Sequence, residues 1–120
     1  KRAKKYTFNK ALGVLEHHGQ ESETELNVWK TPLCAGKERL KDREGKKVHS
    51  TQKPEALLER VILTSTKEGD VVFDPVAGTG TTGFVAKKFK RHFVMTEING
   101  KYVKAIHRRF SENLGWFMDE

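Results

Sequence analysis

The spacing of apolar residues forms a regular pattern only in the second half of the chain. Residues 55–66 carry leucine, valine and isoleucine on one side of a helix, directly after Pro54, and proline suits the first turn of a helix. Residues 71–73 are an apolar run without alternation, which is typical of a parallel strand covered on both faces. We therefore predict a helix, a turn and then a buried strand.

A second helix and a second strand are predicted after the glycine-rich segment 78–83. Either Thr81 or Thr82 can cap a helix that continues past Phe84, and residues 92–97 have the composition of a strand. These elements complete a unit of strand, glycine loop, helix and strand.

A third helix is predicted to begin at Asn99, whose side chain can cap it. The residues of its apolar stripe are Tyr102, Val103, Ile106 and Phe110. The cationic residues predicted to face outward are Lys104, Arg108 and Arg109. The pattern therefore indicates an amphipathic helix.

The first part of the chain shows little periodicity. Residues 1–25 are expected to be irregular, and residues 27–29 indicate a short strand that ends before Pro32. The charged run 37–47 indicates an exposed loop. Trp29 is expected to pack in the core.

Composition limits the class of protein. With 120 residues, 36% of them hydrophobic and 32% charged, the chain is long enough for one compact domain. It has no apolar run of about eighteen residues and no leader sequence, so we expect no membrane span, no signal peptide and a cytoplasmic location. The formal net charge of +7 favours polyanionic partners such as nucleic acid.

Metal and thiol chemistry are not expected. Cys34 is the only cysteine, which excludes an intrachain disulfide and a multi-cysteine metal site, and we expect it to be a small buried residue. The five histidines show no metal-ligand spacing. We therefore predict no metal.

The glycine-rich segment 78–83 fits the pattern GxGxxG, and Glu97 follows at the distance expected of a dinucleotide site. A nicotinamide-dependent oxidoreductase must therefore be considered. The Asp74 carboxylate suits a cationic ligand better than a pyrophosphate. S-adenosylmethionine carries an ammonium, a sulfonium and no phosphate. Its carboxylate can use the helix start near Thr81 and Thr82, and Glu97 can bind ribose hydroxyls.

Three motifs together resemble the DNA adenine-N6 and cytosine-N4 methyltransferases in which the cofactor motifs follow the catalytic ones. Residues 49–54, HSTQKP, are similar to the family motif HPTQKP, with serine in place of the first proline. Residues 73–82, FDPVAGTGTT, resemble DPFxGSGTT, with valine and threonine in place of phenylalanine and serine. Glu97 followed by Tyr102 resembles GIExxxxY. The resemblance covers residues 49–110.

The resemblance implies an α/β fold, a partial Rossmann-like class I methyltransferase sheet with parallel strands and flanking helices, and S-adenosylmethionine as the cofactor. The residues it places around the cofactor are Thr51, Lys53, Asp74, Pro75, Gly78, Gly80, Thr81, Thr82, Glu97 and Ile98. Thr51 and Lys53 would close the pocket over the methionine end. Glu97 would bind the ribose, and Ile98 would face the adenine.

The same resemblance divides the chain into two parts. Residues 48–120 would form the S-adenosylmethionine-binding subdomain. Residues 1–47 would be the end of the target-recognition region, a return strand and a basic loop. Duplex DNA is the implied partner, with methylation of adenine N6, or less commonly cytosine N4, in a bacterial or phage modification system.

The catalytic motif of that family is absent from this sequence. The motif contains two adjacent prolines followed by an aromatic residue, and the prolines here, at positions 32, 54 and 75, are never adjacent. We therefore assign no catalytic residue. Because the chain begins at Lys1 rather than at a methionine, we expect the motif upstream in a longer polypeptide or in a partner chain. A catalytically silent DNA-binding or assembly subunit remains an alternative, as does the oxidoreductase.

Overall fold

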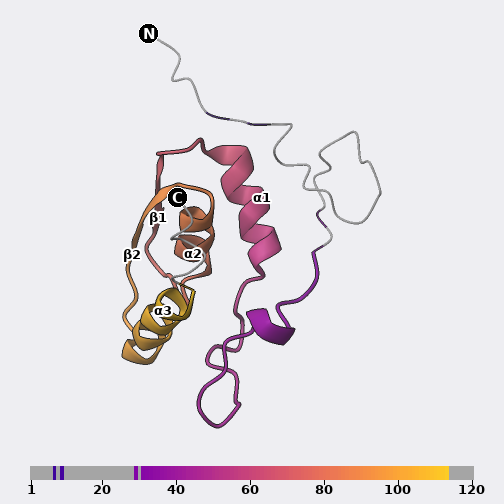
Figure 1. The fold of residues 1–120 in the computed structure, drawn as a ribbon, viewed down its shortest axis with the longest axis vertical. Coiled ribbons are helices and arrows are strands. Elements are labelled where there is room, and N and C mark those ends of the chain that lie inside the picture. Colours follow the sequence, from indigo (N-terminus) through magenta and orange to yellow (C-terminus); the bar gives the residue numbers. More distant parts are fainter. Residues whose placement is uncertain (1–6, 8, 10–28, 30, 114–120) are drawn as a thin grey trace.

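The computed structural model describes residues 7, 9, 29 and 31–113, and Figure 1 shows how their helices and strands are arranged. The irregular region expected over residues 1–25 and the short strand expected at 27–29 lie almost entirely outside the described residues. The structure therefore tests the sequence predictions mainly from Thr31 onward.

The described residues form a parallel βαβ unit with a helix before it and a helix after it. In chain order the elements are the short 3-10 helix η2 (Gly36–Glu38), α1 (Glu55–Ser65), β1 (Val71–Asp74), α2 (Thr81–Lys88), β2 (His92–Met95) and α3 (Gly100–Glu112). The helices and strands predicted from residue 55 onward are confirmed, and their ends differ from prediction by one or two residues.

The two strands pair in parallel, in a register that places Asp74 opposite Met95. The pairing continues past the strands, because the amide of Thr96 donates to the carbonyl of Asp74 and the amide of Ala77 donates to the carbonyl of Thr96, both at 3.0 Å. The glycine loop and Glu97 therefore leave the sheet side by side.

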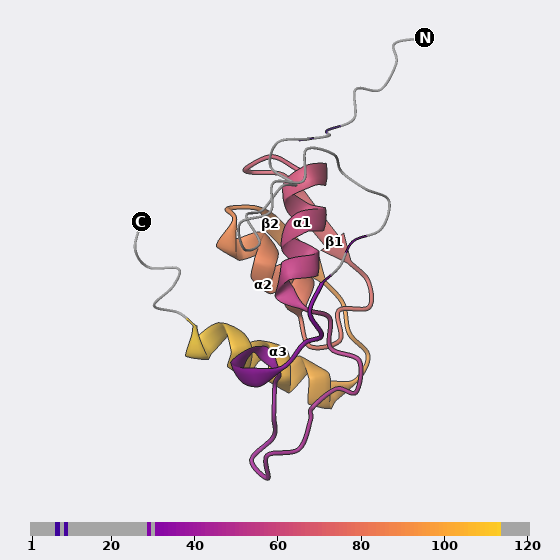
Figure 2. The same cartoon turned by 90° about the vertical axis from the view of Figure 1, so that its right-hand side faces the viewer.

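Helix α2 packs on one face of the sheet, and α1 packs against the other side of α2 (Figures 1 and 2). The buried cluster between them consists of Ile62, Phe84, Val85 and Ala86. Burial of each large apolar side chain contributes about 2 kcal/mol. This packing fixes the helix that follows the glycine loop against the strand that precedes it.

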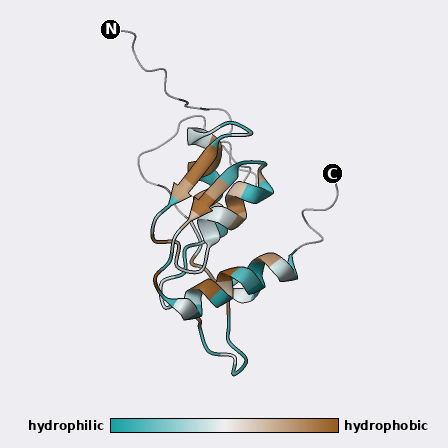
Figure 3. Cartoon of the chain, turned by 90° about the vertical axis from the view of Figure 1, so that its left-hand side faces the viewer, coloured by the Kyte–Doolittle hydropathy of each residue, from teal (hydrophilic) through white to brown (hydrophobic). Residues whose placement is uncertain are grey.

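The opposite face of the sheet is open in the described part of the chain. Val71, Phe73 and Val94 are 64%, 62% and 52% exposed on this face. Figure 3 shows the two apolar strands toward the viewer with no helix across them. The prediction that the first strand is covered on both faces is wrong for the described residues, because α1 and α2 lie on the same side. We call these three residues the open sheet face.

Two predicted details of the helices are wrong. No threonine caps α2: Gly80 holds the N-cap position with φ of 75°, and the Thr81 hydroxyl instead donates to the carbonyl of Lys53. Arg109, predicted to face outward, is 2% exposed because its guanidinium pairs with Glu55 of α1. The predicted cap of α3 is confirmed, since Asn99 Oδ1 accepts from the amide of Lys101 at 2.9 Å.

The segment before α1 lies against this unit mainly through irregular chain. The exposed loop predicted over residues 37–47 is confirmed only for residues 41–47, which a bridge between Lys41 and Lys47 closes. Residues 37 and 38 belong to η2, and residues 38–40 are half-buried. Cys34 is buried, as expected, and Trp29 is half-buried beneath the guanidinium of Arg60. None of the helices described is long and apolar enough to cross a membrane.

Candidate functional site

A cavity of about 350 Å³ lies at the carboxyl end of β1. Its walls are the segment before α1, the end of β1 and the glycine loop. The residues that line it are His49, Thr51, Gln52, Lys53, Asp74, Val76, Ala77, Gly78, Thr79, Thr81 and Thr82. Segments far apart in the sequence therefore meet where a parallel sheet usually binds its ligand.

The glycine loop approaches its neighbours closely. Gly78 and Gly80 have φ of 56° and 75°, in the left-handed region that favours glycine. A Cβ atom at Gly80 would lie 2.9 Å from Cγ1 of Ile106, so α3 leaves room only for a hydrogen there. At Gly83 a Cβ atom would overlap the sulfur of Met95 on β2. The glycines thus allow the loop to turn and allow two elements to pack against it.

Asp74 ends β1 and faces the cavity. Its Oδ1 accepts a hydrogen bond from the amide of Val76 at 3.1 Å. Within the described residues its other carboxylate oxygen has no hydrogen-bond partner. This oxygen is therefore available to a cationic or donor group in the cavity.

Glu97 follows β2 and ties the glycine loop to the start of α3. Its Oε1 accepts from the amide of Asn99 at 2.8 Å, and its Oε2 accepts from the amide of Gly78 at 2.7 Å. The hydrogen bond from Asn99, followed by that from Gly78, lowers the pKa of the Glu97 carboxyl. The group is therefore anionic at neutral pH.

The start of α2 and the segment before α1 form the opposite wall. The Thr81 hydroxyl donates to the carbonyl of Lys53 at 3.3 Å. The Lys53 side chain itself is exposed at the rim. Thr51 donates its amide to Nδ1 of His49 at 3.0 Å. The N-terminus of α2 and the backbone of Lys53 thus lie side by side in the cavity wall.

Most of the residues predicted around the cofactor meet at this cavity. Those that line it are Thr51, Lys53, Asp74, Gly78, Thr81 and Thr82. Glu97 reaches the cavity wall through its bond to Gly78. The others do not line it: Pro75 accepts from the Thr96 hydroxyl through its carbonyl, Gly80 is buried beneath α3, and Ile98 is fully exposed.

Three residues at this site received no role from the sequence. His49 packs its ring 4.4 Å from that of Tyr102 and lies beneath Gly78. Gln52 is buried and fixes the preceding loop, accepting from the amide of Leu40 at 3.0 Å and donating to a carbonyl of η2. Arg109 lies behind the wall formed by Thr81. In the helical pattern Arg109 lies next to the apolar stripe of α3, and this position indicates burial.

No cluster of three or more histidine, cysteine, aspartate or glutamate side chains suited to a metal ion occurs among the residues that the structure describes.

A parallel βαβ unit with a glycine loop after its first strand and a carboxylate after its second is common to Rossmann-like folds. The solved structures that this unit resembles are methyltransferases, so the fold is that of the class I methyltransferases. The model of the N6/N4 methyltransferase family, described as DNA methylase, matches residues 1–108. This chain belongs to that family.

Individual relatives agree with this assignment. The type II methyltransferase M.HinfI of Haemophilus influenzae is 52% identical over 108 residues, which are 90% of this chain and 29% of M.HinfI. The crystal structure of the M1.HpyAVI-SAM complex matches with a TM-score of 0.65 at 32% identity, over 88% of this chain and 44% of that one. The cytosine-N4-specific PvuII DNA methyltransferase matches with a TM-score of 0.53 at 30% identity, over 62% and 29%. The chain thus spans less than half the length of these relatives.

Proposed function

We propose that this chain is the cofactor-binding part of a site-specific DNA amino-methyltransferase. The reaction is transfer of a methyl group from S-adenosylmethionine to adenine N6, with cytosine N4 as the less favoured target, in duplex DNA. The observation that carries the proposal is the cavity at the end of β1, where the free oxygen of Asp74 and the N-terminus of α2 face the same space. Membership of the DNA methylase family supports the same reaction.

The groups around the cavity fit the methionine part of S-adenosylmethionine. The Asp74 carboxylate suits the ammonium and the nearby sulfonium. The first amides of α2 and the ammonium of Lys53 suit the carboxylate. When bound, the cofactor supplies an electrophilic methyl group on its sulfonium. The role of these residues is to bind and orient it.

The ribose fits the other side of the glycine loop. Glu97 uses one lone pair of each carboxylate oxygen for the amides of Gly78 and Asn99, which leaves further lone pairs for two hydroxyl donors. The exposed Ile98 offers an apolar surface next to that position for the adenine. A dinucleotide fits less well, because its pyrophosphate would meet the anionic Asp74 at the same loop.

The acceptor base requires groups from outside this chain. An amine hydrogen is accepted in this family by a motif with adjacent prolines, which the sequence lacks. Two observations support a further catalytic half, in the same parent chain or a second subunit: the relatives are about two to three times as long as this chain, and the open sheet face is apolar. That half would cover the open sheet face and complete the sheet.

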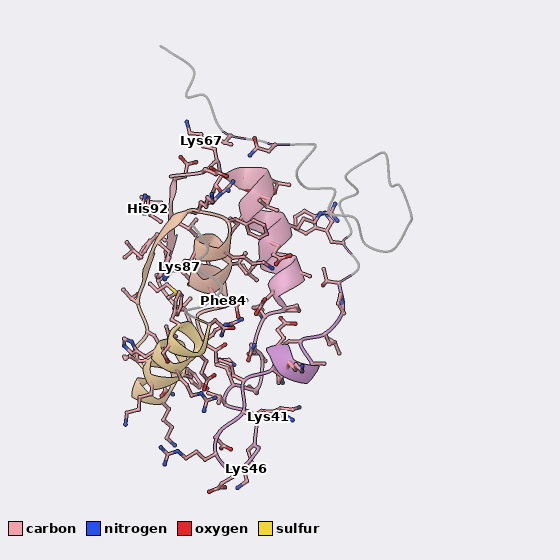
Figure 4. The ribbon with its side chains drawn as sticks, in the orientation of Figure 1. Lys41, Lys46, Lys67, Phe84, Lys87 and His92 are labelled. Carbon is pink, nitrogen blue, oxygen red and sulfur yellow. The ribbon has the colours of Figure 1, made fainter. Side chains whose placement is uncertain are left out.

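Duplex DNA is proposed to contact the basic segment before α1. Lys41 and Lys46 project from a loop that extends away from the helices (Figure 4). The exposed cations of this loop are Lys37, Lys41, Arg43, Lys46 and Lys47. Residues 1–47 would thus form the end of the target-recognition region, in a cytoplasmic enzyme of a bacterial or phage modification system.

The proposed function is tested by incubating the protein, with whatever chain copurifies with it, with methyl-labelled S-adenosylmethionine and unmethylated duplex DNA. The expected result is label on N6 of adenine, identified after digestion to nucleosides. Label on N4 of cytosine would show that cytosine, and not adenine, is the target base. If the complete assembly bound the cofactor but transferred no methyl group, the chain would be a catalytically silent subunit, and the proposal would be contradicted.

A further inference from the structure

Arg109 is a buried cation that the cofactor site described above does not use directly. Its side chain is 3% exposed, whereas that of its neighbour Arg108 is 38% exposed and pairs with Glu112 on the surface. Burial of a guanidinium is costly unless hydrogen bonds and an opposite charge compensate it. The partners of Arg109 therefore indicate why it is buried.

The guanidinium of Arg109 connects three elements. Nη1 donates to the Thr81 hydroxyl at 3.0 Å and lies 3.4 Å from the carbonyl of Thr79, both at the start of α2. Nη2 donates to Glu55 in the first turn of α1 at 2.5 Å. The flat group also lies 4.6 Å above the ring of Phe84. Arg109 therefore fixes α1, the glycine loop and α3 relative to one another.

The bond to Thr81 reaches the cavity. A hydroxyl has a single hydrogen, and Arg109 can only donate, so the Thr81 oxygen accepts from Arg109 and its hydrogen points to the carbonyl of Lys53 at 3.3 Å. Thr79, Thr81 and Lys53 all line the cavity, and Arg109 does not. Arg109 thus supports the cavity wall at Thr81 without lining the cavity itself.

This wall is the one proposed to hold the cofactor carboxylate. The ribose side depends on Glu97, whose bonds go to Gly78 and Asn99 and not to Arg109. Loss of Arg109 would free the Thr81 hydroxyl to rotate and release Lys53 from the start of α2. It would leave the bonds of Glu97 in place.

We propose that Arg109 is a positioning residue for the carboxylate end of S-adenosylmethionine, which it serves through Thr81 and Lys53. The inference rests on the proposed function and adds to it a separate positioning role for each of two residues. Arg109 aligns the groups that meet the carboxylate, and Glu97 aligns those that meet the ribose.

The test compares two ligands by titration calorimetry on the protein as purified. Decarboxylated S-adenosylmethionine keeps the adenosine, the sulfonium and the ammonium and lacks only the carboxylate. In Arg109→Met the affinity for S-adenosylmethionine should fall roughly tenfold or more, as expected when the support of a charge-assisted contact is lost. The affinity for the decarboxylated ligand should stay unchanged.

Two further variants control the experiment. Arg108→Met removes the neighbouring surface arginine and should change neither affinity. Arg109→Lys keeps a cationic donor and should recover part of the affinity for S-adenosylmethionine. If Arg109→Met leaves Glu55 unpaired and fails to fold, as circular dichroism would show, the Glu55→Gln/Arg109→Gln double variant replaces it, because two amides can pair without charge.

The outcomes separate the inference from the proposed function. A wild-type protein that binds neither ligand would refute the proposed function. Equal wild-type affinities for the two ligands would overturn the inference, because the carboxylate would then contribute nothing to the binding free energy. An equal loss of both affinities in the Arg109 variants would also overturn it, since Arg109 would then be only a structural support.

Discussion

Two carboxylates stand at the carboxyl ends of the two strands, and their hydrogen bonds differ. Asp74 lines the cavity and uses one oxygen to accept from the amide of Val76, and its other oxygen has no hydrogen-bond partner among the described residues. Glu97 uses both oxygens to hold backbone amides of the glycine loop and of α3. Asp74 is therefore the carboxylate whose charge is most available to a ligand, and Glu97 also maintains the shape of the site.

Replacement of Asp74 by asparagine should separate ligand binding from folding. Asparagine keeps the oxygen that accepts from Val76, so thermal unfolding should be unchanged. Loss of the negative charge beside the ammonium should weaken S-adenosylmethionine binding roughly tenfold or more. The matched control is Asp70→Asn at the other end of β1, where the side chain accepts from the amide of Lys67. An unchanged affinity in Asp74→Asn would mean that the ligand lies elsewhere.

The lowered pKa of Glu97 predicts a pH dependence of stability. A carboxyl whose pKa is lower in the folded state stabilises the fold above its unfolded pKa, and this contribution is lost as the pH falls through the folded pKa. Wild type should therefore be more stable than Glu97→Gln at pH 7, and the difference should shrink in acid. Urea unfolding of both proteins at pH 7 and near pH 3 measures this. A difference that grows in acid would contradict the prediction.

At the scale of the elements, the periodic pattern of the sequence predicts the features that depend on residues close together in the chain. The helices, the strands and the cap at Asn99 follow from apolar spacing and side-chain chemistry, and they are confirmed. The burial of Arg109 depends on Glu55, which lies 54 residues away in sequence. The helical pattern places Arg109 next to the apolar stripe of α3, but it cannot identify Glu55 as the partner.

The candidate site was predictable to a similar extent. Parallel pairing places Asp74 and Glu97 at the same edge of the sheet as the glycine loop. The family resemblance, and not the pattern of the residues, placed the segment before α1 there. The N-cap of α2 was not predictable in the same way. Gly80 holds that position with a positive φ, and α3 leaves no room there for a Cβ atom. The Thr81 hydroxyl donates instead to the carbonyl of Lys53. Both facts depend on contacts between distant elements.

The close approach of α3 to the glycine loop can be tested with a single methyl group. Gly80→Ala forces alanine into a φ of 75° and places its Cβ 2.9 Å from Ile106, so the free energy of unfolding should fall by about 2–4 kcal/mol. Gly36→Ala is the control, because Gly36 also has a positive φ, 58°, but a Cβ atom there meets no atom within 4 Å. It should cost about 1 kcal/mol. Equal losses in urea unfolding would show that α3 does not restrict the loop.

At the scale of the whole molecule, the open sheet face is the feature that supports the proposal of a larger enzyme. A buried parallel strand is apolar on both faces, and β1 has that composition although only one face is covered in the part described. The sequence pattern thus fits the proposed complete sheet better than it fits the described residues alone. We propose that the catalytic half covers this face.

A polar substitution on the open sheet face should affect assembly and leave cofactor binding intact. Phe73 is 62% exposed, so Phe73→Ser should not alter S-adenosylmethionine binding by the chain itself. It should reduce methyl transfer by the assembled enzyme, because a polar group would be buried at the contact. Val61→Ser, at an exposed position on α1, is the control and should preserve transfer. Full transfer by Phe73→Ser would show that the face stays open in the enzyme.

The central claim is that the cavity at the end of β1 binds a sulfonium cofactor and not a dinucleotide. Titration calorimetry of the purified protein with S-adenosylmethionine, and separately with NAD⁺, tests it most directly. The account predicts saturable binding of S-adenosylmethionine at one site and no heat of binding with NAD⁺. Binding of NAD⁺ without binding of S-adenosylmethionine would contradict it.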